Sequence, residues 1–246
     1  MVALDDKGKS KKGLPALQAD NVELAAIAQK RKEMSLKWTA DQQWVNEAPL
    51  ITTEMIASVG ESSSAEPNSS KETHVRMDDT VVEVQSAFLQ RHENPNHTIF
   101  GGDILIWMDK VAVYCARNFT RNHNMVTISM NRIFFKRPIF QSQVVHMRAR
   151  ICYVRHSTVE VEIEVTTKCD SEQKEEKSHT GYFTVLNLGE GDIRRRVLNG
   201  ILLSQDDQCG MKSFFKAKKR HVFNDDNKDI FVLPPIPVGN SIKSSL

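Results

Sequence analysis

The stretch between Gly101 and about Asn118 places the strongest restriction on how this chain can fold. Two adjacent glycines, Gly101 and Gly102, stand before a run that is almost entirely apolar and is interrupted by one carboxylate, Asp109. As a helix over about 101–118, this run would carry apolar side chains in every direction around its axis. Such a helix is buried on most sides, yet it is shorter than the roughly 20 residues that span a bilayer. We therefore expect a helix that lies inside a sheet curled around it.

Runs in which apolar and polar residues alternate lie on both sides of this helix, as in half-buried antiparallel strands. They cover residues 79–90, 125–135, 143–154, 157–167 and 179–188. In the run 157–167, valines and one isoleucine alternate with Glu160, Glu162 and Glu164. The short connection before this run predicts a hairpin. The expected fold class is α+β, with a sheet of about five strands.

The chain divides by composition into three zones. Residues 1–77 are expected to form an N-terminal extension, with a helical segment around 21–38 and a flexible linker. Residues 78–190 hold nearly all of the periodic sequence and form the expected domain. Residues 191–246 are expected to form a C-terminal extension with a short basic helix and a Pro-rich tail. The basic clusters at 194–196 and 216–220 are interpreted as solvated surface.

The composition also excludes several classes of protein. The 33 Lys and Arg nearly balance the 31 Asp and Glu, so no basic field indicates a nucleic-acid partner. No apolar stretch is long enough for stable membrane insertion. The four cysteines and the histidines show no spacing typical of a metal site, so no metal is expected. With no apolar signal core and with Asp5 and Asp6 near the start, we expect a cytoplasmic protein.

Three segments together resemble a known family. NPNHTIFGG followed by Met108 and Asp109, then VTISMNRIFFKRP, then YVRHSTVEVEIEV, are similar to the hotdog-fold acyl-CoA thioesterases, especially the acyl-CoA hydrolases with two hotdog domains in one chain. The resemblance implies a single hotdog domain over about 78–190 that hydrolyses acyl-CoA to free fatty acid and CoA. It also implies a homodimer or a dimer-based hexamer with active sites at subunit interfaces. It implies no cofactor, since coenzyme A is part of the substrate, and it leaves a mitochondrial location open.

The helix start and Asp109 are the candidate catalytic groups. Backbone N–H groups at a helix start are unpaired and carry partial positive charge, and glycine lets a carbonyl approach closely. We expect the N–H of Gly102 to bind the oxyanion and Gly101 to contact the substrate, although the glycines could simply permit close packing. Asp109 should face a polar cleft, because an uncompensated buried carboxylate is costly. The resemblance supports Asp109 as the base that activates water; the alternatives are an ion pair with Lys110 or Arg117, or a solvated edge of the helix.

The remaining candidates surround these groups. The family pattern places a functional asparagine at Asn94, which could instead shape a turn. Thr127 and Ser129, expected on one face of a strand, could hold water or thioester or be ordinary sheet hydroxyls. Basic residues at strand ends could bind the phosphates of CoA or could simply be solvated strand ends: Lys136, Arg137 and Arg155.

Two other functions stay open for a domain of this kind. A non-catalytic hotdog protein would bind acyl-CoA or act as a scaffold through its long flanks. A hotdog dehydratase or hydratase would need a His-containing acid–base pair, which the sequence does not show. Cys115 reads as a core residue rather than a nucleophile. The presence of both Asn94 and Asp109 in one domain favours the hydrolase.

Overall fold

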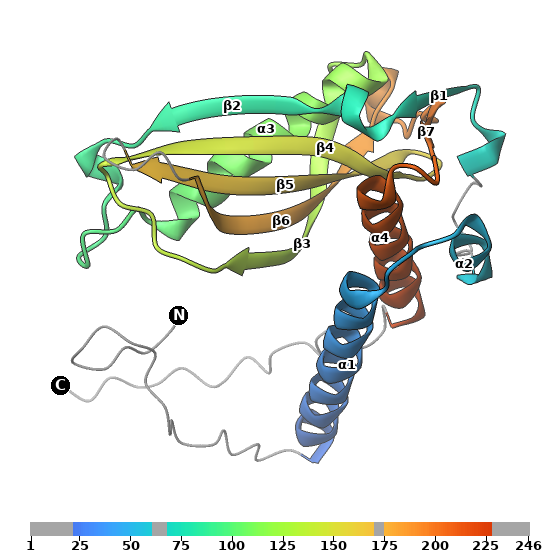
Figure 1. Cartoon of the computed structure of the whole chain (residues 1–246), viewed down its shortest axis with the longest axis horizontal. Helices are drawn as coiled ribbons and strands as arrows, with labels where there is room; N and C mark the ends of the chain where they lie inside the picture. Colours follow the sequence, from blue (N-terminus) through green and yellow to red (C-terminus); the bar gives the residue numbers. More distant parts are fainter. Residues whose placement is uncertain (1–21, 61–67, 170–174, 228–246) are drawn as a thin grey trace. The chain divides into compact units, whose positions relative to one another are not determined.

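The computed structural model describes residues 22–60, 68–169 and 175–227 (Figure 1). The chain divides into a compact unit of Ala48–Asp226 and a second unit of Met1–Glu47 with Asn227–Leu246. In the second unit, the structure describes the helix α1 (Val22–Glu47). Side chains one turn apart are hydrogen-bonded along α1, from Gln29 to Glu33 and from Gln43 to Glu47, as expected for an exposed helix.

A five-stranded antiparallel sheet forms the centre of the unit Ala48–Asp226 (Figure 1). Its strands are β2 (Val82–Ala87), β3 (Met125–Phe135), β4 (Gln143–Val154), β5 (Thr158–Cys169) and β6 (Glu176–Asn187). Their order across the sheet is β2-β4-β5-β6-β3, so β2 and β3 are the edges. The predicted hairpin joins β4 to β5, where Val154 pairs with Val159. The prediction of an α+β fold with about five strands is confirmed.

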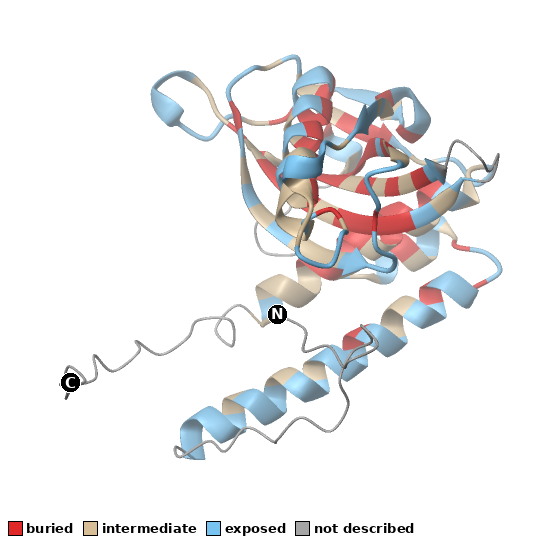
Figure 2. Cartoon of the chain, turned by 90° about the vertical axis from the view of Figure 1, so that its left-hand side faces the viewer, coloured by how far each residue is buried: buried red, intermediate tan, exposed pale blue. Residues whose placement is uncertain are grey.

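The helix α3 (Gly101–Thr120) packs on the concave face of this sheet. Its contact with the sheet forms the core (Figure 2), to which α3 contributes Ile104, Met108, Val111, Ala112, Cys115, Ala116 and Phe119. Burial raises the pKa of the Cys115 thiol to about 12, which fits a core residue. One side of α3 is not covered, with Ile106 57% and Tyr114 53% exposed. The helix is thus buried on most sides, as expected, and one side is left exposed in a single chain. None of the helices formed by the described residues is both long and apolar enough to cross a membrane.

The compact unit is wider than the expected domain of 78–190, because segments from both flanks pack onto it. α2 (Thr53–Ser58) and β1 (Thr73–Arg76) precede the sheet, and β1 pairs in parallel with β7 (Asn199–Leu202). Lys71 joins these segments to the sheet by donating from Nζ to the carbonyls of Arg155 and Val197, both at 3.0 Å.

The basic segment near the C-terminus is part of a longer helix, α4 (Gln208–Asp226), which packs against β4 on the outer face of the sheet (Figure 1). The ring of Tyr153 of β4 packs edge-to-face against that of Phe214 of α4, with ring centroids 5.0 Å apart. Lys218 and Arg220 are buried. The prediction that residues 216–220 form a solvated surface is therefore wrong for these two side chains.

Candidate active site

The start of α3 presents backbone donors that no side chain caps. Phe100 is the N-cap residue, and its carbonyl accepts from the N–H groups of Asp103 and Ile104 at 3.0 and 3.3 Å. Within the described part of the chain, the N–H groups of Gly101 and Gly102 have no hydrogen-bond partner. A Cβ on Gly102 would lie 2.4 Å from the ring of Phe100, which is itself exposed. The helix start can therefore bind an anionic oxygen once the Phe100 ring gives way.

Asp109 lies two turns further along α3. A helix turns by about 100° per residue, so Asp109 lies on the flank of the stripe that carries Met108 and faces the sheet. Its Oδ1 is buried and has no hydrogen-bond partner among the residues that the structure describes. Neither Lys110 nor Arg117 forms an ion pair with it in that part of the chain, which removes the alternative of an ion pair. A buried carboxylate oxygen without a partner is uncommon in folded proteins and needs an explanation.

Thr127, like Asp109, has a buried side-chain oxygen without a hydrogen-bond partner in the described ranges, whereas Ser129 does not. The hydroxyl of Thr127 is buried without a partner in the described ranges, and Thr127 pairs with the core residue Val185 of β6. A β-bulge follows, so Ser129 pairs with Thr184, on the opposite face. The prediction that Thr127 and Ser129 share one face is wrong, because the bulge adds a residue and reverses the alternation. Ser129 instead donates to Asn131 at 3.1 Å.

Asn94 shapes the loop that leads into α3. Its Nδ2 donates to Thr98 Oγ1 at 2.8 Å, and its Oδ1 accepts from the N–H of Asn96 at 2.8 Å. The turn-forming role is therefore present in this structure, and one N–H of the carboxamide remains for another acceptor.

Sequence reasoning missed the pair His92 and Asp103 at the same helix start. His92 Nδ1 lies 3.2 Å from Asp103 Oδ2, and the N–H of Phe100 donates to the carbonyl of His92. These contacts fix the loop against the first turn of α3. No periodicity in the sequence connects the two residues, so only the fold brings them together.

The three basic candidates fall into two groups. Lys136 and Arg137 follow β3 at the end where Phe135 approaches Gly101, and Arg137 forms an ion pair with Glu176. Arg155 lies in the β4–β5 hairpin, whose strands meet the opposite end of β6. There its guanidinium is 3.0 Å from Asp225 of α4. The structure therefore does not bring Arg155 to the helix start.

Comparison with known proteins shows what this chain is similar to. Residues 96–173 match the thioesterase superfamily. Protein VdlD of Helicobacter pylori is 30% identical over 98 residues, which are 40% of this chain and 56% of the relative, so the match spans only about half of its length. The resemblance to hotdog-fold thioesterases is confirmed.

Two solved hotdog structures share the fold. The acyl-CoA hydrolase of Staphylococcus aureus, solved in complex with butyryl coenzyme A and coenzyme A, has a TM-score of 0.57 and is 18% identical; the match covers 64% of this chain and 96% of that one. The acyl-CoA hydrolase of Bacillus cereus has a TM-score of 0.58 and is 21% identical, over 67% and 100% of the two chains. At this level of identity, these thioesterase structures establish the single hotdog fold of this chain.

Proposed function

We propose that this chain hydrolyses acyl-CoA thioesters to a free fatty acid and CoA. The observation that carries the proposal is the buried, unpaired Oδ1 of Asp109, on the helix whose first N–H groups are uncapped. A buried carboxylate without a partner is costly, and thioester hydrolysis uses both a base and an oxyanion donor.

In the proposed reaction, Asp109 accepts a proton from water as the water oxygen attacks the thioester carbon. The carbonyl oxygen becomes an oxyanion and accepts a hydrogen bond from the N–H of Gly102. When the tetrahedral intermediate collapses, the carbon–sulfur bond breaks and the proton passes from Asp109 to the leaving thiolate. Thr127, with its unpaired hydroxyl, is proposed to hold the water or the thioester.

The Staphylococcus aureus hydrolase supports this assignment. It has been solved as variants in which one asparagine, one aspartate or one threonine is replaced by alanine. The asparagine and the aspartate of that protein are fifteen residues apart, as are Asn94 and Asp109. The threonine follows the aspartate by seventeen residues there, and Thr127 follows Asp109 by eighteen here.

The active form is proposed to be a homodimer or a hexamer built from dimers. Besides the uncovered side of α3, the edge strand β3 carries exposed apolar side chains: Val126, Ile128, Met130 and Phe134. Long apolar edges are covered in stable proteins, and contiguous exposed apolar surface marks an interaction site. A partner subunit on this surface would cover the flank of α3 that carries Asp109 and supply its Asn94.

Release of free CoA from a panel of acyl-CoAs tests the proposal. Asp109→Asn keeps the shape of the side chain and removes the base, so kcat should fall about 10²-fold to 10⁴-fold. The matched control is Asp206→Asn, at an exposed position in the turn before α4, which should leave kcat unchanged.

Two results would contradict the proposal at different points. If the wild-type protein releases no CoA at any chain length, the domain is a binding or scaffold protein. If it releases CoA and Asp109→Asn is as active as the wild type, another group activates the water.

A further inference from the structure

Asp103 places a carboxylate in the same turn of α3 as the proposed oxyanion donors. After the N-cap residue Phe100, the glycine pair occupies the first two helical positions, and Asp103 occupies the third. A side chain at this third position can reach back to a backbone N–H at the helix start, as in the capping box. The partial positive charge of the helix start also attracts a carboxylate. A carboxylate bound there would occupy the donors that a thioester oxygen needs.

In this structure the carboxylate of Asp103 is held by His92 instead. Its Oδ2 lies 3.2 Å from His92 Nδ1. In a capping box the side chain at the third position would accept from the N–H of the N-cap residue. Here that N–H, of Phe100, donates to the carbonyl of His92 at 2.8 Å. His92 thus engages both groups that would form a capping box, one through its carbonyl and the other through its ring.

The ring of His92 is held in the orientation that this contact needs. A guanidinium can only donate, so Arg91, whose Nε lies 3.2 Å from His92 Nε2, makes Nε2 the acceptor. The hydrogen of the neutral imidazole is then on Nδ1, which faces Asp103. The ring of Phe88 packs edge-to-face against His92, with centroids 5.5 Å apart, and against Trp107 of α3, with centroids 5.6 Å apart.

We propose that His92 is a positioning residue of the oxyanion site. By donating to Asp103, it keeps this carboxylate off the N–H groups of the glycine pair, which stay free for the thioester oxygen. A carboxylate bound to these groups would also repel the negative charge that develops on that oxygen. The inference deepens the proposed hydrolase and rests on it. If His92 only fixed the loop of Asn94, removing Asp103 would make no difference to a His92 variant.

Steady-state release of CoA by paired variants tests the proposal. His92→Phe keeps a ring beside Phe88 and removes the donor, so kcat should fall about 10-fold to 100-fold at an unchanged KM. Adding Asp103→Ala should restore kcat, because no carboxylate remains to occupy the N–H groups. His92→Asn retains an N–H donor and should stay close to the wild type. His156→Ala, at an exposed position in the β4–β5 hairpin, is the matched control and should leave kcat unchanged.

Amide resonances give a readout that does not depend on catalysis. The chain has 11 glycines, so nitrogen-15 labelling of glycine alone gives a small set of signals. Gly101→Ala and Gly102→Ala assign the pair. In His92→Phe, an amide proton of the pair should move downfield as it donates to Asp103, and it should move back in the double variant. If the resonances behave in this way in a protein that releases no CoA, the hydrolase is refuted and the positioning role stands.

The opposite results would overturn the positioning role and leave the hydrolase standing. One is a double variant that releases CoA as slowly as His92→Phe and has the same glycine resonances. Another is wild-type kcat in His92→Phe. Asp103→Ala alone leaves the rings of His92 and Phe88 in place and should lower kcat less than His92→Phe does; a larger loss would also overturn the proposal. Melting temperatures of all variants separate these effects from unfolding.

Discussion

Gly181 sets how closely α3 approaches the sheet beside Asp109. A Cβ at this position on β6 would lie 2.6 Å from Ile133 Cδ1 and 2.8 Å from Met108 Cε. Met108 is fully buried and precedes Asp109 in the chain. Both contact atoms end flexible side chains, but Met108 lies in the packed core and has little space to move into. The glycine thus positions the turn of α3 that carries the proposed base.

We expect Gly181→Ala to destabilise the fold by about 1–2 kcal/mol, because overpacking forces side chains out of their preferred rotamers. It should also lower kcat by displacing Asp109. Urea unfolding measures the first effect. Gly60→Ala is the control, since a Cβ there has nothing within 4 Å, and it should change stability by less than about 0.5 kcal/mol. Wild-type stability in Gly181→Ala would show that α3 has room to shift.

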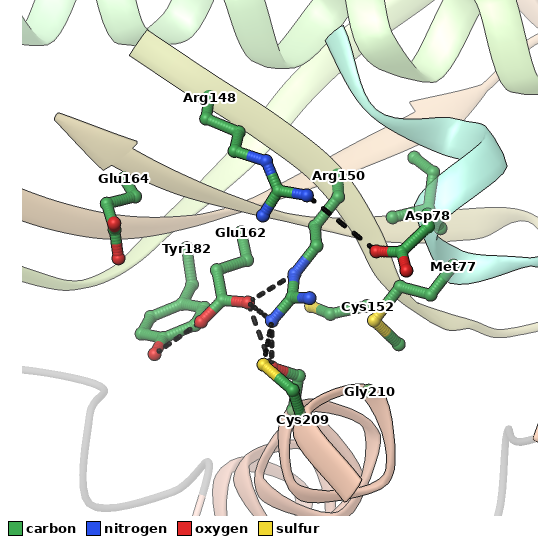
Figure 3. A network of polar contacts seen from close by, with 12 residues as sticks. Met77, Asp78, Arg148, Arg150, Cys152, Glu162, Glu164, Tyr182, Cys209 and Gly210 are labelled. Atoms are coloured by element: carbon green, nitrogen blue, oxygen red, sulfur yellow. Dashed lines mark hydrogen bonds and ion pairs between the residues drawn. The ribbon is translucent and has the colours of Figure 1, made fainter. Parts of the chain in front are cut away.

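At the level of elements, buried charges hold α4 on the sheet. Glu160 of β5 is fully buried, forms an ion pair with Arg220, and lies 3.0 Å from His221 Nε2 through its other oxygen. Burial raises the pKa of Glu160, but the two cationic partners outweigh it and bring the pKa down to about 2. A second cluster lies beside it (Figure 3), where Arg150 donates to Glu162 at 2.9 Å. Two of the three alternating glutamates of β5, Glu160 and Glu162, are thus covered by α4.

Glu160→Gln should destabilise the protein by about 3–5 kcal/mol, because it leaves Arg220 and His221 buried without their anion. The carboxyl has a lower pKa in the fold than its ordinary 4.5. Its contribution is therefore complete above pH 4.5 and is lost as the pH falls from about 4.5 to about 2. Urea unfolding at several pH values should show this loss in the wild type and not in the variant.

Glu164→Gln is the matched control on the same strand. Glu164 is partly exposed and pairs with Lys177, so its removal should cost less than about 1 kcal/mol. If the two substitutions lower the free energy of unfolding equally, burial under α4 does not strengthen the contacts of Glu160.

At the scale of the whole molecule, a single chain leaves its site open. The exposed side of α3 adjoins the flank that carries Asp109, the edge strand β3 has exposed apolar side chains, and the carboxamide of Asn94 is hydrogen-bonded within its own loop. If a second subunit covers this surface, a complete site combines Asp109 of one chain with Asn94 of the other.

This arrangement predicts complementation between two inactive variants. Asn94→Ala and Asp109→Ala, refolded together in equal amounts, should recover about a quarter of wild-type activity, since half of the dimers are mixed and each has one intact site. Each variant refolded alone is the control and should remain inactive. Mixed dimers without activity would place both residues of a site in the same chain, and a fully active monomer by light scattering would exclude the shared site.

Much of the fold could be predicted because its signals are local. The all-round apolar helix, the alternating strands and the hairpin each follow from side-chain periods of 3.6 and 2 residues. Asp109 could also be singled out from a local signal, because it is one charge within an apolar run. The family resemblance then predicted that these elements form a hotdog fold.

The remaining features of the fold and the site depend on contacts between segments far apart in the chain, which the periodicity of the sequence does not predict. A β-bulge in β3 places Ser129 on the opposite face of the strand from Thr127. The hairpin places Arg155 at the end of the sheet away from the start of α3, and α4 covers Glu160 of β5. The sequence by itself determined which helix and strands form and which carboxylate is out of place. Only the tertiary structure decided which faces are covered and which residues meet, because pairing register and helix docking are set between segments far apart in the chain.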